Sequence, residues 1–397
     1  MKNLVEKAVI LSAVRTPIGK YGGAFKETGA VTLGVATSVE AMKRARVSPD
    51  QIDEVIFGMA RQAGNRPNPA RQVLYRSGIP IDRPAFTVNK ACASGMKAIA
   101  LGCQSLLLGE NKIVLAGGME NMSQIPYLLD GARWGYRLGD GVLIDAMYRD
   151  GLFCPLAEMI MGETVDLLAE KFGISRREQD EYALESQMKA KRAAEKGKLK
   201  DEIVPVTVKG KGGMESVISD DEHPRPDTTP ENLAKLPPVF RKGGSVTAGN
   251  SSGLTDGAAA LILTTQSEAR KLGARPLAEI LGVASAGVDP KEMALGPVPA
   301  TKKILKSLNL SLADFDLVEI NEAFAAQVLA CERELKWDSA KRNIKGGAIA
   351  LGHPIGCTGA RITVTLLHNL IQEDKELGLA TLCVSGGQGM SLVLRRM

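Results

Sequence analysis

A layered α/β fold with two similar halves is predicted by three features of this 397-residue sequence. Short β-branched runs alternate with longer helical patterns, as in proteins whose sheets are covered by helices. One segment of the first half appears again in the second half. A long insertion then interrupts the first copy. A chain of this length is long enough to bury a sizeable core and to form two or three domains.

The predicted strands occupy short apolar runs, and one helix between them is unusually apolar. Residues 1–12 carry Lys2, Glu6 and Lys7 ahead of a very short apolar stretch, which fits a first strand and is too short for a secretory signal. Residues 94–108 are small and apolar throughout, so we expect a helix that is buried on all sides. Further strands are predicted at 54–57, 112–116, 317–320 and 380–384.

The internal repeat rests on two alignments. Residues 48–57 align with 311–320 at an offset of 263, and residues 114–118 align with 383–387 at an offset of 269. In the second half the glycine pair runs almost directly into a strand, whereas in the first half the matching strand, 257–263, comes far later. We therefore expect an insertion at roughly 121–246, which holds a strongly charged helix over 175–198.

Composition excludes several classes of function. Aromatic residues make up only 4% of the chain and the net charge is a modest +5, which argues against a nucleic-acid partner. No run approaches the roughly 20 apolar residues of a membrane span. The six cysteines have neither a disulfide framework nor zinc-ligand spacing, so we expect reduced thiols, no metal and a cytoplasmic protein.

Two cysteines and one histidine stand out because each lies in a glycine-rich turn. Cys92 and Cys383 occupy turns where backbone and ligand are able to approach closely, unlike cysteines inside continuous apolar runs. The chain has three histidines. We expect His223 to lie in a charged, solvated loop, and His368 to lie in a helix without local polar partners. His353 is therefore the candidate base.

These motifs resemble those of the thiolases, which make or cleave 3-ketoacyl-CoA thioesters. The resemblance covers essentially the whole chain, and its motifs occur in the family's order. They are residues 14–19, 89–95, 321–327, 346–356 and 383–389. The resemblance implies two similar five-stranded α/β halves packed in layers, with a loop domain inserted in the first half.

The resemblance also gives domain boundaries and an assembly. We expect the first half to comprise 1–120 and 247–272, the loop domain 121–246 and the second half 273–397. Thiolases are homodimers or homotetramers, so the same is expected here. No permanently bound cofactor is implied, because CoA and acyl-CoA are substrates.

The resemblance assigns a role to each reactive residue. Cys92, at an expected strand-to-helix junction, would be the nucleophile that carries the acyl group, helped by the positive end of the helix dipole. His353 would accept its proton. Cys383 would take a proton from acetyl-CoA in condensation and return one in thiolysis. One oxyanion hole would use His353 with a water held by Asn321, and the other the backbone N–H groups of Cys92 and Ser385.

The CoA site follows from the same resemblance. Ser252 matches the serine that contacts the pantetheine, and Arg225 matches an arginine near the adenine and phosphates. The expected channel is otherwise largely apolar, and any of its apolar members could equally be plain core. Its residues are Leu152, Ile160, Met161, Phe240, Ala248, Met293, Ala323 and Phe324.

The sequence departs from the family pattern at three positions. Ser385 replaces a common glycine, which leaves the geometry of its oxyanion hole open. Ile160 stands where many short-chain thiolases carry histidine, and an apolar residue there would favour a longer acyl chain. Cys357 replaces a small residue and is expected to be structural.

The expected activity is acyl transfer between CoA thioesters with short or medium acyl chains, in condensation or in thiolysis. A long-chain 3-ketoacyl-CoA thiolase of fatty-acid β-oxidation is the alternative within the family. A decarboxylating ketoacyl synthase is disfavoured because a second cysteine stands in place of another histidine. A non-catalytic thiolase-fold scaffold is disfavoured because Cys92 and His353 are both present.

Overall fold

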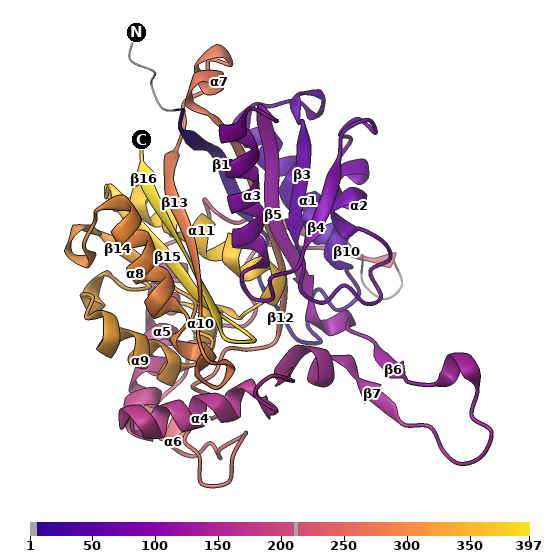
Figure 1. The fold of residues 1–397 in the computed structure, drawn as a ribbon, viewed down its shortest axis with the longest axis vertical. Coiled ribbons are helices and arrows are strands. Elements are labelled where there is room, and N and C mark those ends of the chain that lie inside the picture. The colour runs from indigo at the N-terminus through magenta and orange to yellow at the C-terminus, as the bar shows by residue number, and fades with distance from the viewer. Residues whose placement is uncertain (1–5, 210–212) are drawn as a thin grey trace.

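The computed structural model describes residues 6–209 and 213–397, and within them ten strands form one continuous sheet. Two halves of that sheet meet where β1 pairs antiparallel with β13 (Figure 1). The strands of the first half, in spatial order, are β1 (Ala8–Arg15), β12 (Thr255–Thr265), β5 (Ile113–Asn121), β3 (Glu54–Gly58) and β4 (Ala85–Val88), with β2 (Gly19–Lys20) beside β12. Those of the second half are β13 (Ala278–Gly287), β16 (Gln388–Arg396), β15 (Leu377–Val384) and β14 (Leu317–Ile320). Residues 1–5, which belong to the stretch predicted as a first strand, lie outside the described part of the chain.

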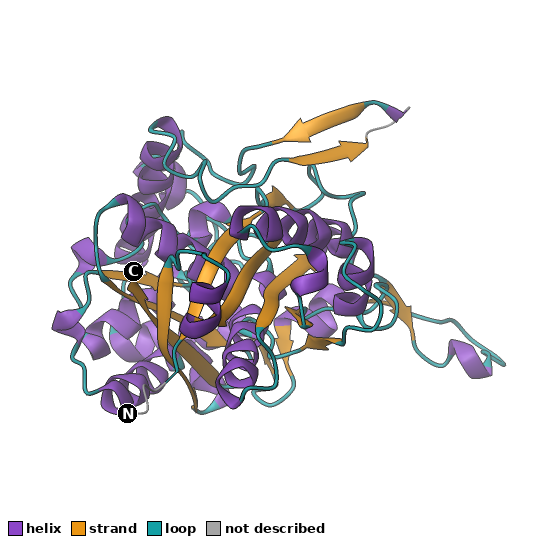
Figure 2. Ribbon diagram, turned by 90° about the horizontal axis from the view of Figure 1, so that it is seen from above, coloured by secondary structure: helices purple, strands orange, loops and turns teal. Residues whose placement is uncertain are grey.

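Helices cover both faces of each half-sheet, which gives the predicted layered α/β fold (Figure 2). The helices α3 (Ser94–Leu108) and α11 (Ile355–Gln372) pack between the two halves. Their buried side chains form one hydrophobic core with alternate residues of strands from both halves. The outer face of the first half is covered by α1 (Ala30–Ala45) and α2 (Pro69–Arg76), with α7 (Gln266–Lys271) after β12. The outer face of the second half is covered by α8 (Pro297–Leu308) and α9 (Ala325–Leu335), and the short α10 (Ala348–Leu351) precedes α11.

The predicted repeat is confirmed at its first alignment. Residues 48–57 and 311–320 each begin with a capping box, Ser48 with Gln51 and Ser311 with Asp314, and each continues into a short parallel strand. Both halves also carry a bulge in the strand at their junction, between Ile10 and Ser12 in β1 and between Ile280 and Gly282 in β13.

The second alignment of the repeat was wrong in register. Val55 pairs with Leu115, and its counterpart Val318 pairs with Leu379, so β5 matches β15 at an offset of 264 (379 − 115) rather than 269. The glycine pairs that suggested 269 are not equivalent: Gly117 and Gly118 lie inside β5, whereas the other pair forms the turn after β15.

Two other expectations need correction. The second half contains four strands within the described chain, and a single parallel bridge between Val318 and Arg342 stands in the fifth position. The helix α3 has its predicted bounds but is not buried on all sides, since Leu107 and Leu108 are 52% and 74% exposed at its end. The stretch Ala91–Leu108 has a mean hydropathy of 1.3, enough by composition to cross a membrane, and 67% of it is buried in this core.

The segment between β5 and β12 forms hairpins and helices below and beside the main sheet (Figures 1 and 2). A long hairpin built on β6 (Tyr127–Leu129) and β7 (Leu143–Asp145) projects from the body as an arm. The remaining elements of the segment are β8 (Phe153–Cys154), β9 (Met159–Ile160), α4 (Met161–Phe172), α5 (Arg176–Glu195), β10 (Val206–Lys209), β11 (Glu215–Ile218) and α6 (Pro230–Ala234). The charged helix predicted over 175–198 is α5, with Ser175 as its N-cap. The domain boundaries stay a prediction.

Candidate active site

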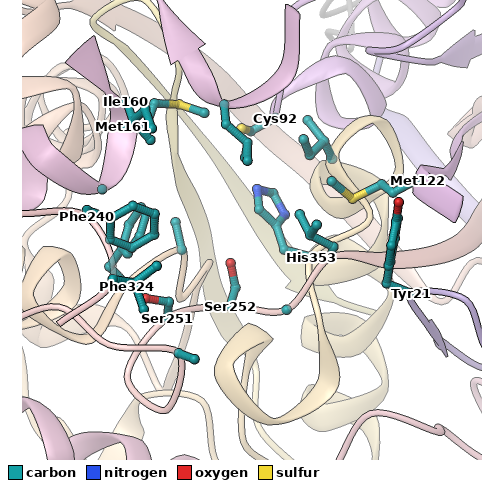
Figure 3. A pocket seen from close by; sticks show the side chains of 18 of the residues that line it. Tyr21, Cys92, Met122, Ile160, Met161, Phe240, Ser251, Ser252, Phe324 and His353 are labelled. Atoms are coloured by element: carbon teal, nitrogen blue, oxygen red, sulfur yellow. The ribbon is translucent and has the colours of Figure 1, made fainter. Parts of the chain in front are cut away.

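One cavity of about 540 Å³ collects almost every residue that the sequence singled out. Cys92, His353 and Cys383 line it, and the imidazole of His353 projects into it between Cys92 and Ser252 (Figure 3). Of the predicted residues, those that also line it are Leu152, Ile160, Met161, Arg225, Phe240, Ala248, Ser252, Met293, Ala323, Phe324 and Ser385. Asn321 is not among the described lining residues.

Cys92 lies in a tight turn between β4 and α3, as predicted. The preceding Ala91 has a positive φ of 44°, a conformation that a non-glycine residue holds only when its surroundings fix it. Ser94 fixes it, because its Oγ accepts from the Lys90 N–H at 2.9 Å and donates to the Ala91 carbonyl at 2.6 Å. The turn therefore presents the thiol to the cavity in one orientation.

Burial raises the pKa of the Cys92 thiol above its usual range. The Ser385 N–H, the Arg61 cation and the cysteine's own N–H act in the opposite direction, while the Glu120 carboxylate adds to the increase. Burial outweighs the favourable helix end, so the resting thiol is protonated. It needs a base before it is able to attack a substrate.

His353 is placed and polarised to be that base. Its Nδ1 lies 2.6 Å from Thr358 Oγ1, and the Thr358 hydroxyl donates its only proton to the Pro354 carbonyl at 3.0 Å. The Thr358 oxygen must therefore accept from Nδ1–H, which leaves the lone pair on Nε2. Burial, together with Arg361 and Arg61, lowers the pKa of His353 to about 3, so the ring is neutral. Thr358 is a site residue that was not predicted from the sequence.

Cys383 is the next-to-last residue of β15 and lines the same cavity. Burial raises its pKa well above the usual value, and Cys92 and Cys331 raise it further, which marks the two site thiols as neighbours. The turn after β15 shows whether serine fits at position 385, where thiolases commonly carry glycine. The described residues with positive φ there are Gly386 and Gly387, each at 82°, and not Ser385. Serine is thus accommodated without strain, and its N–H faces the Cys92 sulfur.

Asn321 follows β14 behind the cavity wall. Its N–H donates to the Thr381 carbonyl at 3.0 Å, while both polar atoms of its buried amide have no hydrogen-bond partner in the described chain. Such an amide is suited to hold a water molecule. The next residue, Glu322, is buried and accepts from Tyr182 Oη at 2.9 Å and Ser186 Oγ at 2.7 Å, which fixes this turn against α5.

The prediction for His223 was wrong. The ring is half-buried rather than solvated, donates from Nδ1 to the Ala350 carbonyl at 2.8 Å, and packs on Gly253. It lines the main cavity and a second one of about 430 Å³ that shares Arg225 and Ala248 with it. These contacts join segments far apart in sequence, so only the charged character of the loop was visible beforehand.

The remaining histidine and cysteines are structural in position. His368 has no polar partner near it in the sequence, as expected, but its Nε2 lies 2.9 Å from the carbonyl of the distant Ala13. Burial raises the pKa values of Cys103, Cys331 and Cys357 to about 12. Cys357 is 1% exposed within the shared core of α3 and α11, which agrees with the structural role expected for it.

Comparison with known proteins places the whole chain in one family. Residues 8–267 match the thiolase N-terminal domain and residues 274–396 the thiolase C-terminal domain. The acetyl-CoA acetyltransferase of Escherichia coli (strain K12) is 51% identical, over 99% of this chain and 100% of that protein. A crystal structure of the Bacillus anthracis acetyl-CoA acetyltransferase superimposes with a TM-score of 0.97 at 48% identity, covering 100% of both chains.

The human mitochondrial 3-ketoacyl-CoA thiolase in complex with CoA is similar as well, with a TM-score of 0.95 at 43% identity over 99% of each chain. These matches extend over nearly the whole chain, and the motifs, the fold and the cavity all agree with them. The chain belongs to the thiolase family of acyltransferases.

Proposed function

We propose that the protein transfers acyl groups between CoA thioesters through an acyl-enzyme on Cys92, with acetoacetyl-CoA and other short 3-ketoacyl-CoA thioesters as its substrates. One observation carries the proposal: two thiols and a neutral imidazole line one cavity. Similar proteins named acetyl-CoA acetyltransferase support the short acyl chain.

In the thiolysis direction, His353 Nε2 takes the proton from Cys92 Sγ, and the thiolate attacks the keto carbon of the substrate. The carbon–carbon bond next to it breaks, and the acetyl-CoA that leaves takes a proton from Cys383. The CoA thiol then gives its proton to the Cys383 thiolate and attacks the acyl-Cys92 thioester. The Cys92 thiolate that leaves takes back its proton from His353, and acyl-CoA departs. Condensation runs through the same steps in reverse, with Cys383 removing the proton from acetyl-CoA.

Two sets of donors support the negative charge that develops on the reacting oxygens. The N–H groups of Cys92 and Ser385 would form one oxyanion hole, consistent with the Ser385 N–H facing the Cys92 sulfur. A water on the unpartnered amide of Asn321, together with His353, would form the other. Hydrogen-bond donors that are fixed before the reaction stabilise the charge of the transition state more strongly in a buried cavity than in water.

The second cavity supports a CoA site. It adjoins the cavity that holds Cys92 and His353, because Arg225 and Ala248 line both cavities. Polar residues such as Gln187, Asp227 and Asn232 also line the second cavity. The pantetheine would lie along Ser252 and the apolar channel, and the nucleotide end would lie toward Arg225. The human mitochondrial 3-ketoacyl-CoA thiolase, a similar protein, has been solved in complex with CoA, which supports CoA as the ligand.

We also propose a cytoplasmic homodimer or homotetramer, with no membrane or nucleic-acid partner and no resident cofactor. Strand β4 is an edge of the main sheet with partly exposed residues, which suits pairing with a second copy. The arm exposes large apolar side chains, including Trp134 at 87% and Leu138 at 99%. Light scattering of the purified protein tests this, and a monomer would contradict it.

The test of function compares kcat/KM for CoA-dependent thiolysis of acetoacetyl-CoA with that for a long 3-ketoacyl-CoA. The proposal expects the short substrate to be preferred. Preference for the long substrate would assign the protein to fatty-acid β-oxidation instead, with Ile160 as part of an opened channel. Absence of thiolysis with either substrate would overturn the proposal.

A further inference from the structure

Arg61 lies in the loop after β3, outside the thiolase-like motifs of the sequence. Its Nη2 donates to the Gly151 carbonyl at 2.9 Å, in the short helical turn that ends at Leu152 on the cavity wall. Its Nη1 donates to the Ala60 carbonyl at 3.3 Å. That same carbonyl accepts from Asn89 Nδ2 at 3.1 Å, at the start of the Cys92 turn.

The backbone of this loop is held as firmly as the side chain. The buried Glu120 carboxylate accepts from the N–H groups of Ala60 at 3.0 Å and Arg61 at 3.1 Å, and from that of Gly356 at 2.8 Å, in the first turn of α11. One loop therefore connects the turn of Cys92, the helix that follows His353 and the helical turn at Gly151, whose last residue, Leu152, lines the cavity.

The charge of Arg61 acts on both reacting groups. It lowers the pKa of the Cys92 thiol and that of His353. The other groups that face Cys92 are the Glu120 carboxylate, which opposes ionisation, the neutral Cys383 and His353, and the Ser385 N–H. Because guanidinium stays protonated at all working pH values, Arg61 supplies a constant positive charge at a buried thiol.

We propose that Arg61 is a positioning residue that ties the Cys92 turn, through the Ala60 carbonyl, to the helical turn at Gly151 and places a positive charge at the nucleophile. The proposal rests on Cys92 being the nucleophile of the proposed function. The loop after β3 would then supply a positive charge at Cys92 that no residue of the thiolase-like motifs supplies.

The experiment measures the rate of Cys92 alkylation by iodoacetamide against pH, with the modified peptide identified by mass spectrometry. In Arg61→Gln we expect the midpoint of the pH profile to rise by roughly one unit, which makes alkylation about tenfold slower at pH 7. Arg61→Lys keeps the charge, so its midpoint should be close to that of the protein with the original sequence. Arg61→Met, which retains an aliphatic stem, repeats the test if the Gln variant does not fold.

Arg66→Gln is the matched control, because Arg66 is an exposed arginine of the same loop. It has a positive φ of 62° that glutamine tolerates no better or worse than arginine. A midpoint in Arg61→Gln equal to that of the control would overturn the proposal, as would an Arg61→Lys midpoint displaced as far as that of the Gln variant. Failure of the proposed function looks different, since the unmodified protein would then show neither selective Cys92 labelling nor thiolysis.

Discussion

Replacing Thr358 by valine tests how the protein fixes the base. Valine keeps the volume of threonine but removes the oxygen that accepts from His353 Nδ1–H at 2.6 Å. A buried N–H without a partner costs about 1–3 kcal/mol. The ring therefore shifts toward the tautomer that carries its proton on Nε2, where it has no lone pair for the Cys92 proton. This energy corresponds to an acylation rate lower by about 5- to 150-fold.

The assay is a single-turnover measurement of CoA release as acetyl-CoA acylates Cys92. Thr358→Ser retains the hydroxyl and serves as the control, with the melting temperature of each variant showing that the fold persists. If Thr358→Val acylates as fast as the unmodified protein, the tautomer argument fails. Equal defects in the serine and valine variants would refute it too, because loss of packing rather than of the hydrogen bond would then be responsible.

Three further outcomes are expected. Cys383→Ala should still release CoA when acetyl-CoA acylates Cys92, but thiolysis should fall by about 10²- to 10⁴-fold in steady-state assays because the proton donor is missing; normal thiolysis would remove Cys383 from the mechanism. Ile160→His should lower kcat/KM for long relative to short substrates by about fivefold, since it places a polar group in an apolar channel; an unchanged ratio would contradict this. Burial raises the pKa of Glu319 to about 8, so the native state holds a proton that the unfolded chain loses near 4.5. Its contribution to stability is present below pH 4.5 and is lost as the pH rises through about 8. Glu319→Gln should therefore flatten the decline in the free energy of unfolding, measured with urea, between pH 4.5 and about 8; an unaltered decline would show that Glu319 does not titrate there.

Local sequence was sufficient where a motif fixes a turn. Cys92, His353 and Cys383 were identifiable because each lies among glycines or small residues that permit a close turn, and the apolar channel followed from resemblance. The limits of α3 were also predictable, because a run of small apolar residues ends at a glycine with positive φ.

The rest depended on contacts between distant segments. His223 looked solvated because its sequence neighbours are charged, yet Gly253 and Ala350 bury it from far along the chain. Thr358 carried a usable signal, a hydroxyl one helical turn after Pro354, but its bond to His353 becomes visible only once the turn is folded. The register error in the repeat had the same origin, since similar glycine pairs outweighed a strand pairing that sequence does not display.

The corrected register explains why nucleophile and base meet. An offset of 264 relates Gly95 to Gly359 (359 − 95), and these glycines face each other's helices in the central layer. A Cβ on Gly95 would lie 2.8 Å from the Ala360 nitrogen, and one on Gly359 would lie 2.5 Å from the Met96 nitrogen. Only glycine at both positions allows α3 and α11 to approach this closely.

The same offset relates Asn89 to His353 (353 − 89) and Cys92 to Gly356 (356 − 92), so the two catalytic turns are equivalent positions of the repeat. Because each turn leads directly into one of the two central helices, close packing of these helices brings the turns together at one end of the central layer. One copy of the turn carries the nucleophilic thiol of Cys92 and the other the imidazole of His353, and neither turn contains both. The active site is thus a product of how the halves pack, and a change that separates α3 from α11 should disable acyl transfer even with Cys92 and His353 intact.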